Sequence, residues 1–320
     1  MTIAKKIALL LALASTCGAA IAQTYPAHPL RMIVPFAAGG GTDIASRSLA
    51  DGMAQPLGQP VIVENRPGAN GIVGMDYVLQ QPADGYMLLM FSSSTAVAHH
   101  FINRPFDLQK TFIPIGNVSR APVVLAVNPK RLDVKTLPQL VAWLKANPGT
   151  PYGTVGPGSL SHLSMTAFSS QQGFSVTHIP YKGGAPAVQD AAGGQIPFVM
   201  ADLTALKPFM DSGALRPVSV ISSKRIAQYP DVPSSAEQGY GDFIAESVNG
   251  PVVAAGTPAA AVERLTVAVK EAAARPAFVG IISTPGNDPT FIDGPAFGRM
   301  ITESYQRFGR VIRDNNIRME

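Results

Sequence analysis

Short apolar runs alternate along the chain with longer segments in which apolar residues recur every three or four positions. The runs Met32–Val34, Val61–Val63 and Tyr86–Phe91 predict buried strands, and the segments 44–57 and 72–80 predict helices between them. Strands that alternate with helices are typical of an α/β fold with a mainly parallel sheet. In such folds, ligands bind beyond the carboxyl ends of the strands.

The second half of the chain continues this alternation. Strands are predicted at 122–127, 196–200 and 252–255, and helices at 259–274 and 295–314. The fold class is therefore expected to be α/β throughout.

The length and the order of these elements predict two domains. A chain of 320 residues exceeds one ordinary core and suits two domains of roughly 100–200 residues each. We expect a discontinuous domain 1, made of residues 23–123 and 222–320, and a domain 2 made of residues 124–221. The apolar runs 122–127 and 215–221 are then the strands that cross between the two domains.

The first 22 residues have the pattern of a cleaved secretory signal peptide. Lys5 and Lys6 precede an apolar run, and the small residues that follow it fit cleavage after Ala22. The only cysteine, Cys17, lies inside this segment, so the mature chain needs no disulfide. Lipid attachment at Cys17 is disfavoured, because Ala14 stands where a bacterial lipobox usually has leucine. These features predict a soluble protein of the bacterial periplasm.

The composition excludes other classes of protein. The chain is 46% hydrophobic and 14% charged, which indicates a globular protein. Its formal charge of +4 is scattered, and the sequence shows no cluster of lysine and arginine interleaved with aromatic residues. We expect no nucleic-acid partner, and we expect a monomer.

Two glycine-rich turns carry the candidate chemistry. In the first, Gly39–Gly41 stand between the end of a strand and two N-cap residue types at the start of a helix. In the second, Gly156 and Gly158 precede Ser159, another N-cap type. A turn of this kind aims free backbone N–H groups and the positive end of a helix at one point, where an anion can bind.

Seven motifs, in a fixed order, resemble the Bug or TctC-type substrate-binding proteins of tripartite tricarboxylate transporters. They span nearly the whole mature chain: Val34–Asp43, Val63–Gly71, Ala83–Tyr86, Gly153–Ser159, Pro180–Gly183, Tyr229–Pro233 and Ala255–Pro258. Each motif is weak alone, but the ordered set is highly specific.

The resemblance implies a two-domain periplasmic binding protein fold, a flytrap whose domains are joined by two crossing strands. It implies capture of a small carboxylate-containing ligand for delivery to the membrane subunits of a transporter, without catalysis and without a cofactor. In the family, the two glycine loops grip one ligand carboxylate, partly through water. Ser247–Pro251 lacks an aromatic residue that many members have, and Phe91–Thr95 is a loose match, so the identity of the ligand stays open.

Carried over position by position, the resemblance implies a set of ligand-binding residues drawn from five loops. They are Phe36, Ala38, Gly39, Gly40, Thr42, Asp43, Ser93, Thr95, Thr154, Gly156, Gly158, Ser159, His162, Gly184, Ala185 and Asp202.

Charged residues near these loops have different expected roles. Asp43 is expected to cap a helix, because its carboxylate would repel an anionic ligand. Asp202 either accepts a hydrogen bond from a ligand amine or hydroxyl or is an ordinary loop acid, and Lys182 is expected to be solvated. Arg31 and Arg47 are not expected to reach the tip of the first loop. Backbone N–H groups after Phe36 and around residues 156–159 should then hold the anion without an essential arginine.

Enzymatic alternatives fit the sequence poorly. A dinucleotide fingerprint needs a third glycine where Ile44 stands. Ser159 and His162 are close enough on a helix to suggest a serine hydrolase, but the nucleophile-elbow motif Gly-x-Ser-x-Gly is missing there. His99 and His100 are adjacent and so project in different directions, which predicts surface or loop histidines and no metal site.

One alternative to transport stays open at this point. The same ligand-binding domain would serve a periplasmic sensing protein that signals to a membrane sensor kinase.

Overall fold

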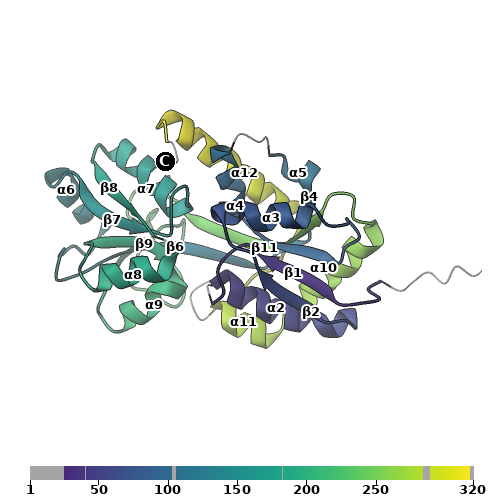
Figure 1. Cartoon of the computed structure of the whole chain (residues 1–320). Helices are drawn as coiled ribbons and strands as arrows, with labels where there is room; N and C mark the ends of the chain where they lie inside the picture. The colour runs from purple at the N-terminus through teal and green to yellow at the C-terminus, as the bar shows by residue number, and fades with distance from the viewer. Residues whose placement is uncertain (1–24, 40, 103–105, 182, 284–288, 318–320) are drawn as a thin grey trace, which may run out of the picture.

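The computed structural model describes residues 25–39, 41–102, 106–181, 183–283 and 289–317. Two α/β lobes share one curled sheet with the strand order β2-β1-β3-β11-β6-β9-β7-β8, and β4 and β10 pair off this path with β11 and β6 (Figure 1). The predicted fold class, an α/β binding protein with two crossing strands, is confirmed. The predicted signal peptide lies outside the described residues. In the part of the chain that is described, no helix is both long and apolar enough to span a bilayer.

The first lobe is built on three parallel strands, β1, β2 and β3, beside the antiparallel strand β11. Its strands are β1 (Leu30–Val34), β2 (Val61–Asn65), β3 (Met87–Ser92), β4 (Phe112–Pro114), β5 (Gly116–Asn117), β11 (Glu246–Ala254) and β12 (Ile292–Asp293). Its helices are α2 (Gly41–Leu57), η1 (Ala69–Gly71), α3 (Ile72–Leu79), α4 (Ser93–Ala98), η2 (His99–Phe101), α5 (Leu108–Thr111), α10 (Ala259–Ala273), α11 (Pro276–Ser283) and α12 (Gly294–Asp314).

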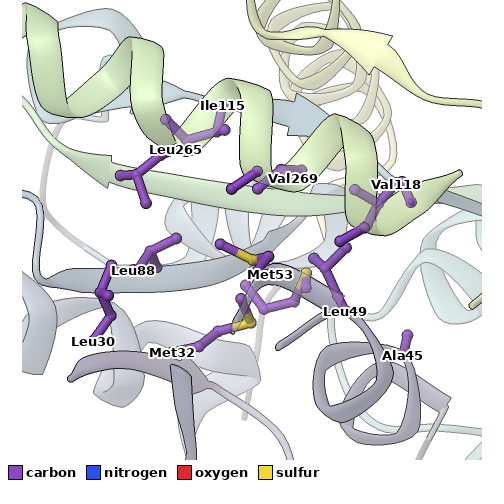
Figure 2. Close-up of a cluster of buried hydrophobic side chains, with 14 of the residues drawn as sticks. Leu30, Met32, Ala45, Leu49, Met53, Leu88, Ile115, Val118, Leu265 and Val269 are labelled. Carbon is purple, nitrogen blue, oxygen red and sulfur yellow. The ribbon is translucent and has the colours of Figure 1, made fainter. Parts of the chain in front are cut away.

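The core of this lobe follows from the spacing of apolar residues on α2. Leu49, Met53 and Leu57 recur every four residues, so they share one helix face, and all are buried. Figure 2 shows Leu49 and Met53 in a cluster with strand residues and with side chains of α10. A Cβ on Gly52 would lie 2.8 Å from the Cβ of Ala272, so a glycine is what lets α2 and α10 approach this closely.

The second lobe repeats the design with the parallel strands β7, β8 and β9. Its strands are β6 (Ser119–Val127), β7 (Thr150–Thr154), β8 (Val176–Pro180), β9 (Phe198–Asp202) and β10 (Arg216–Val220), and its helices are α6 (Leu137–Ala146), α7 (Leu160–Gln172), α8 (Gly184–Ala192) and α9 (Leu203–Asp211). One buried cluster joins this sheet to α6 and α7, and another joins it to α8 and α9.

The strands that cross between the lobes are β6 and β11, which pair from Glu246↔Pro122 to Asn249↔Ser119. The prediction that residues 215–221 form the second crossing strand is wrong. That run forms β10, which pairs with β6 inside the second lobe.

The segment between β10 and β11 packs with the second lobe. Phe243 and Ala245 lie in its core, and the backbone of Ala245 bonds to Ile221 and Val123 on either side. We therefore propose Glu246, and not residue 222, as the point where the chain returns to domain 1.

An apolar contact also joins the lobes at one side. Leu160 and Leu163 of α7 pack with Val97 of α4 and with Phe308 and Ile312 of α12. The C-terminal helix of the first lobe therefore rests against the helix that begins at the second glycine loop.

Candidate functional site

Five helices begin where parallel strands end. In the first lobe α2 follows β1 and α4 follows β3, and in the second lobe α7, α8 and α9 follow β7, β8 and β9. The two sets of strand ends point toward the junction of the lobes (Figure 1). Because each helix start carries unpaired N–H groups and a partial positive charge, this junction favours an anion.

Close approaches between loops show that these ends converge. A Cβ on Gly41 of the first lobe would lie 3.5 Å from Oγ1 of Thr204 in the second lobe. Within the second lobe, a Cβ on Gly184 would lie 3.3 Å from Ala205 and 3.7 Å from Val155. Asn70 of the first lobe donates a hydrogen bond of 2.7 Å to the carbonyl of Pro157 in the second glycine loop.

The first glycine loop is exposed and is braced from beneath by an ionised carboxylate. Ala38 and Gly39 are exposed, Phe36 and Thr42 are half-buried, and Asp43 is buried. The Gly39 N–H donates to Asp43 Oδ2 at 2.9 Å. Gly40 lies outside the described residues.

Two further side chains complete this brace. Asn65 Nδ2 donates to Asp43 Oδ1 at 2.8 Å and to the Phe36 carbonyl at 3.1 Å. Arg47 lies 3.0 Å from Asp43 Oδ1 in an ion pair and also donates to Asn65. Burial opposes ionisation of Asp43, but the hydrogen bonds from Arg47, Gly39 and Asn65 outweigh it and lower its pKa.

The start of α2 corrects one expectation. The helix was predicted to open at Ile44 after caps at Thr42 and Asp43, but it begins at Gly41. Asp43 therefore lies in the first turn and reaches back to the loop, so it holds the loop without capping the helix from outside. Because these three partners already bind its carboxylate, Asp43 is not available for direct contact with an anion.

The second glycine loop is buried except at Pro157, which is exposed, and Val155, which is half-buried, and it is held by uncharged groups. Thr154 Oγ1 lies 2.6 Å from Nε2 of His178. The His178 ring stacks on His162, with centroids 3.9 Å apart and planes at 11°. The Gly158 N–H donates to Nδ1 of His162 at 3.1 Å. Burial lowers the pKa of each histidine to about 4, so both are neutral at pH 7.

Ser159 caps α7 as predicted, since its Oγ accepts from the His162 backbone N–H at 3.3 Å. The hydroxyl itself donates to the Gly156 carbonyl at 2.7 Å. Because His162 Nδ1 is already occupied by Gly158, the pair is not arranged as the nucleophile and base of a hydrolase.

The backbone N–H groups expected to face the ligand in this loop are engaged internally. The Gly156 N–H points at Thr154 Oγ1 at 3.3 Å, and the Ser159 N–H donates to the Gly156 carbonyl at 3.3 Å. The first donors left without an intrahelical partner are those of Leu160 and Ser161, at the start of α7.

Asp202 ends β9 and stands immediately before α9. Its side chain is exposed to water, and among the described residues no group hydrogen-bonds to it as a cap. Desolvation by the surrounding protein nevertheless raises its pKa to about 6. Asp202 thus stands at the carboxyl end of β9, on the side of the second lobe that faces the junction, with its carboxylate open to a ligand. Lys182, in the neighbouring loop, lies outside the described residues.

The remaining predicted residues divide into two groups. Gly184 is half-buried and Ala185 exposed at the start of α8. Ser93 and Thr95 are fully buried, and their hydroxyls bond to the Val248 N–H and to Ser92 within the first lobe. The segment expected to be a loop there is the helix α4, and both hydroxyls are used inside the first lobe.

The interpretation of His99 and His100 as surface or loop histidines is wrong. His99 is buried and stacks on Phe106, and His100 stacks on Tyr305 and bonds to its carbonyl at 2.8 Å. Among the described residues, no group of three or more acidic, histidine or cysteine side chains could hold a metal ion.

A separate surface hollow of about 740 Å³ lies beside Trp143, Lys130 and Arg131. It is bordered by Thr150, at the amino end of β7, so it lies at the opposite end of the sheet from the glycine loops. None of the described residues that border it belongs to the start of α2, α4, α7, α8 or α9.

Three residues that brace the loops were not predicted: Asn65, Asn70 and His178. Asn65 and Asn70 lie in the motif Val63–Gly71, from which no site residue was predicted. The pairing of Thr154 with His178 follows from the register of β7 and β8, in which Thr154 faces Pro180 and Tyr152 faces His178. The residue types at these positions do not reveal how β7 and β8 are aligned.

Comparisons with known proteins agree with this geometry. A family model described as tripartite tricarboxylate transporter family receptor (TctC) matches residues 45–317. BugT of Bordetella pertussis is 34% identical over 318 residues, which cover 98% of this chain and 97% of BugT.

Solved structures resemble the chain over nearly its whole length. One described as a periplasmic transporter is 34% identical, covers 92% of this chain and 100% of its own, and has a TM-score of 0.84. A Rhodopseudomonas palustris protein with adipate is 28% identical at a TM-score of 0.83, covering 92% of this chain and 99% of its own. MatC of the same species, with bound malate, is 25% identical at a TM-score of 0.81, covering 90% and 100%.

One of these relatives was solved with adipate and another with bound malate, and the lobes, crossing strands and facing loops described above are compatible with a ligand held between the lobes. The chain belongs to the tripartite tricarboxylate transporter receptor family, TctC, which includes the Bug proteins.

Proposed function

We propose that this protein captures a small dicarboxylate between its two lobes and delivers it to the membrane subunits of a tripartite tricarboxylate transporter. The observation that carries the proposal is the meeting of glycine loops and helix starts from both lobes at one junction. The family description, a transporter receptor, favours transport over signalling to a sensor kinase.

The site holds the carboxylate through backbone dipoles. Asp43 and Arg47 neutralise each other beneath the first loop, and His162 and His178 are neutral beneath the second. Helix starts and backbone N–H groups then supply the attraction, directly or through water. Charge-assisted hydrogen bonds contribute about 1.5–3 kcal/mol each, so three or four suffice for a tight complex without an arginine.

Asp202 selects the rest of the ligand. Its carboxylate has no hydrogen-bonding cap role among the described residues, and a hydroxyl or ammonium group of a ligand would satisfy it. The relatives solved with malate and adipate support the dicarboxylate class. Of these two, malate carries a hydroxyl that can donate to Asp202, so we favour hydroxy- or amino-dicarboxylates.

The same proposal includes the location and the oligomeric state of the protein. The mature protein acts in the periplasm as a monomer after cleavage behind Ala22, and it releases its ligand unchanged. The signal-peptide pattern and the relative described as a periplasmic transporter support this location.

A thermal-shift screen tests the proposal. The mature protein is heated with malate, adipate, aspartate, citrate and uncharged analogues of similar size. A ligand present at 100 times its dissociation constant adds about 2.7 kcal/mol to the free energy of unfolding, which gives a clear shift. A shift with dicarboxylates, with the ligand recovered intact, is expected. Chemical conversion of the ligand, or no shift with any acid, would contradict the proposal.

A further inference from the structure

The peptide group between Pro157 and Gly158 is bonded at both ends by residues of different lobes. Its oxygen accepts from Asn70 Nδ2 of the first lobe at 2.7 Å, and its N–H donates to His162 Nδ1 of the second lobe at 3.1 Å. Hydrogen bonds on the two ends of one peptide group polarise it and strengthen each other. The orientation of this one group therefore depends on both lobes.

Asn70 is presented to the second lobe by a strained turn. Ala69 and Asn70 both have left-handed backbones, with φ of 45° and 52°. The turn is also wedged against α4, because a Cβ on Gly71 would come within 2.5 Å of Thr95 Oγ1. Strain of this kind persists where the surrounding structure over-determines it, and it clusters at ligand clamps and switches.

The other end of the peptide group is held by a rigid support. His162 stacks on His178, and His178 is fixed by Thr154 at the end of β7. Burial lowers the pKa of His162 to about 4, so its ring is neutral at pH 7, and the N–H of Gly158 directed at Nδ1 makes that nitrogen the acceptor. The second loop thus has one partner in its own lobe, His162, and one in the other lobe, Asn70, which it keeps only while the lobes are close together.

We propose that Asn70 is the latch of the closed state: it joins the lobes by locking the Pro157–Gly158 peptide that His162 already holds. Opening the lobes withdraws Asn70 and frees the peptide oxygen. Closure restores the bond and fixes the loop from which α7 starts. The effect on ligand affinity rests on the proposed function, whereas the effect on closure does not.

Asn70→Gly is the decisive variant, because glycine removes the amide and also relieves the left-handed strain. Ala69→Gly relieves strain in the same turn but keeps the amide. Asn316→Gly is a second control: it relieves the same kind of backbone strain at the end of α12, where φ is 49°, far from the Asn70 turn in sequence. His162→Phe keeps a ring to stack on His178 but removes the acceptor for Gly158.

Two measurements separate the latch from the binding function. Calorimetry and stopped-flow kinetics with malate and adipate give affinity and dissociation rate. Spin labels at Lys145→Cys and Glu263→Cys, exposed positions on α6 and α10, give the distance between the lobes without ligand. Labelling is specific because the only cysteine, Cys17, lies in the predicted signal peptide.

Asn70→Gly is expected to bind about fivefold more weakly, mainly through faster dissociation, without loss of melting temperature. Its apo distances should shift toward the open state. His162→Phe should show a partial shift of the same sign, and both glycine controls should match wild type in affinity and distance. If wild type binds neither acid, the dicarboxylate proposal fails, while the apo distances still test the latch. Distances for Asn70→Gly equal to those of Ala69→Gly would overturn it.

Discussion

The two glycine loops have the same plan in sequence but are supported by opposite chemistry. The first is exposed and rests on an ionised carboxylate, Asp43, which binds Arg47, Asn65 and the loop itself. The second is largely buried, with only Pro157 exposed, and rests on two stacked neutral imidazoles, His162 and His178. The buried Asp43 carboxylate is tolerated because Arg47, Asn65 and Gly39 compensate its charge, whereas the two half-buried imidazoles carry no charge that needs a partner.

Both supports leave no net charge beneath their loop. In the first loop the charges of Asp43 and Arg47 cancel, and in the second there is no charge to cancel. Neither loop offers a net cation or a net anion to the ligand. What remains is the dipole of each helix start, which explains how an anion site forms without an arginine at its centre.

The largest expected difference between the loops is their tolerance of a side chain. Gly158 and Gly39 both have left-handed backbones, with φ of 67° and 79°. Gly158 is buried, whereas a Cβ on Gly39 would meet no atom within 4 Å. Gly158→Val should weaken ligand binding about a hundredfold or more, and Gly39→Val about tenfold, since only the exposed loop can relax.

Calorimetry on the two folded variants checks this order, with circular dichroism as the control for folding. An equal or larger loss for Gly39→Val would mean that the two loops do not differ in rigidity.

The next largest expected effect is the loss of folding stability when Asp43 or Arg47, which support the first loop, is replaced. Asp43→Ala removes hydrogen bonds from Gly39, Asn65 and Arg47, and should lower the free energy of unfolding by about 2–3 kcal/mol. Arg47→Ala should cost about 0.5–1 kcal/mol, because Arg47 is half-exposed and Asp43 keeps its other donors. Urea unfolding measures both, and Arg47→Ala should leave ligand affinity within a few fold. A larger loss for the arginine variant would make the ion pair, and not the loop brace, the main support.

The neutral support predicts a dependence on pH. The pKa of His162 and of His178 falls from 6.5 to about 4 on folding. The unfolded chain then binds more protons between these values, so stability is fully present above pH 6.5 and is lost as pH falls toward 4.

Melting temperatures across this window check the prediction, and His162→Phe should lose less stability on acidification than wild type. Identical pH profiles for the two proteins would show that His162 titrates normally. The charged support acts in a lower window, because Asp43 has a lowered pKa and its contribution is lost only below the ordinary aspartate value.

The smallest expected effect is at Asp202, where stability changes with pH in the direction opposite to that of the histidines. Its pKa is raised to about 6, so it favours the folded state at low pH and loses that contribution as pH rises through 6. Asp202→Asn should therefore raise the melting temperature at pH 7.5 by about 1–3 °C and have little effect near pH 3.5. The same variant should weaken malate binding and not adipate binding. A lower melting temperature at pH 7.5 would mean that Asp202 has a stabilising partner.

The sequence predicted the elements that depend on local pattern. Strands β1, β2 and β3 and the helices between them follow from apolar periodicity, and the Ser159 cap follows from residue type. The crossing strand β11 was missed except for its end, because Gly250 and Pro251 interrupt its apolar run. Gly250 is required there, since a Cβ would overlap the carbonyl of Gly116, so the packing that demands glycine also hides the strand.

The supports of the site depend on contacts that local pattern does not encode. Asn65 and Asn70 lie in the same motif, Val63–Gly71, but Asn65 braces its own lobe and Asn70 reaches across to Pro157. His162 was predicted either to orient the loop or to lie beside the ligand, and in the structure its ring stacks on His178 and accepts a hydrogen bond from the loop at Gly158. Residue type identified the loops, and only the fold shows what holds them.

The central claim, that backbone groups of both lobes hold a ligand carboxylate, is tested most directly by a crystal structure of the mature protein with malate. We predict a carboxylate at the junction of the lobes, within about 3 Å of N–H groups at the starts of α2 and α7 or of waters bound to them. We also predict Asn70 bonded to Pro157 and no arginine in contact with the ligand. A ligand paired with an arginine, or bound beside Trp143, would contradict the account.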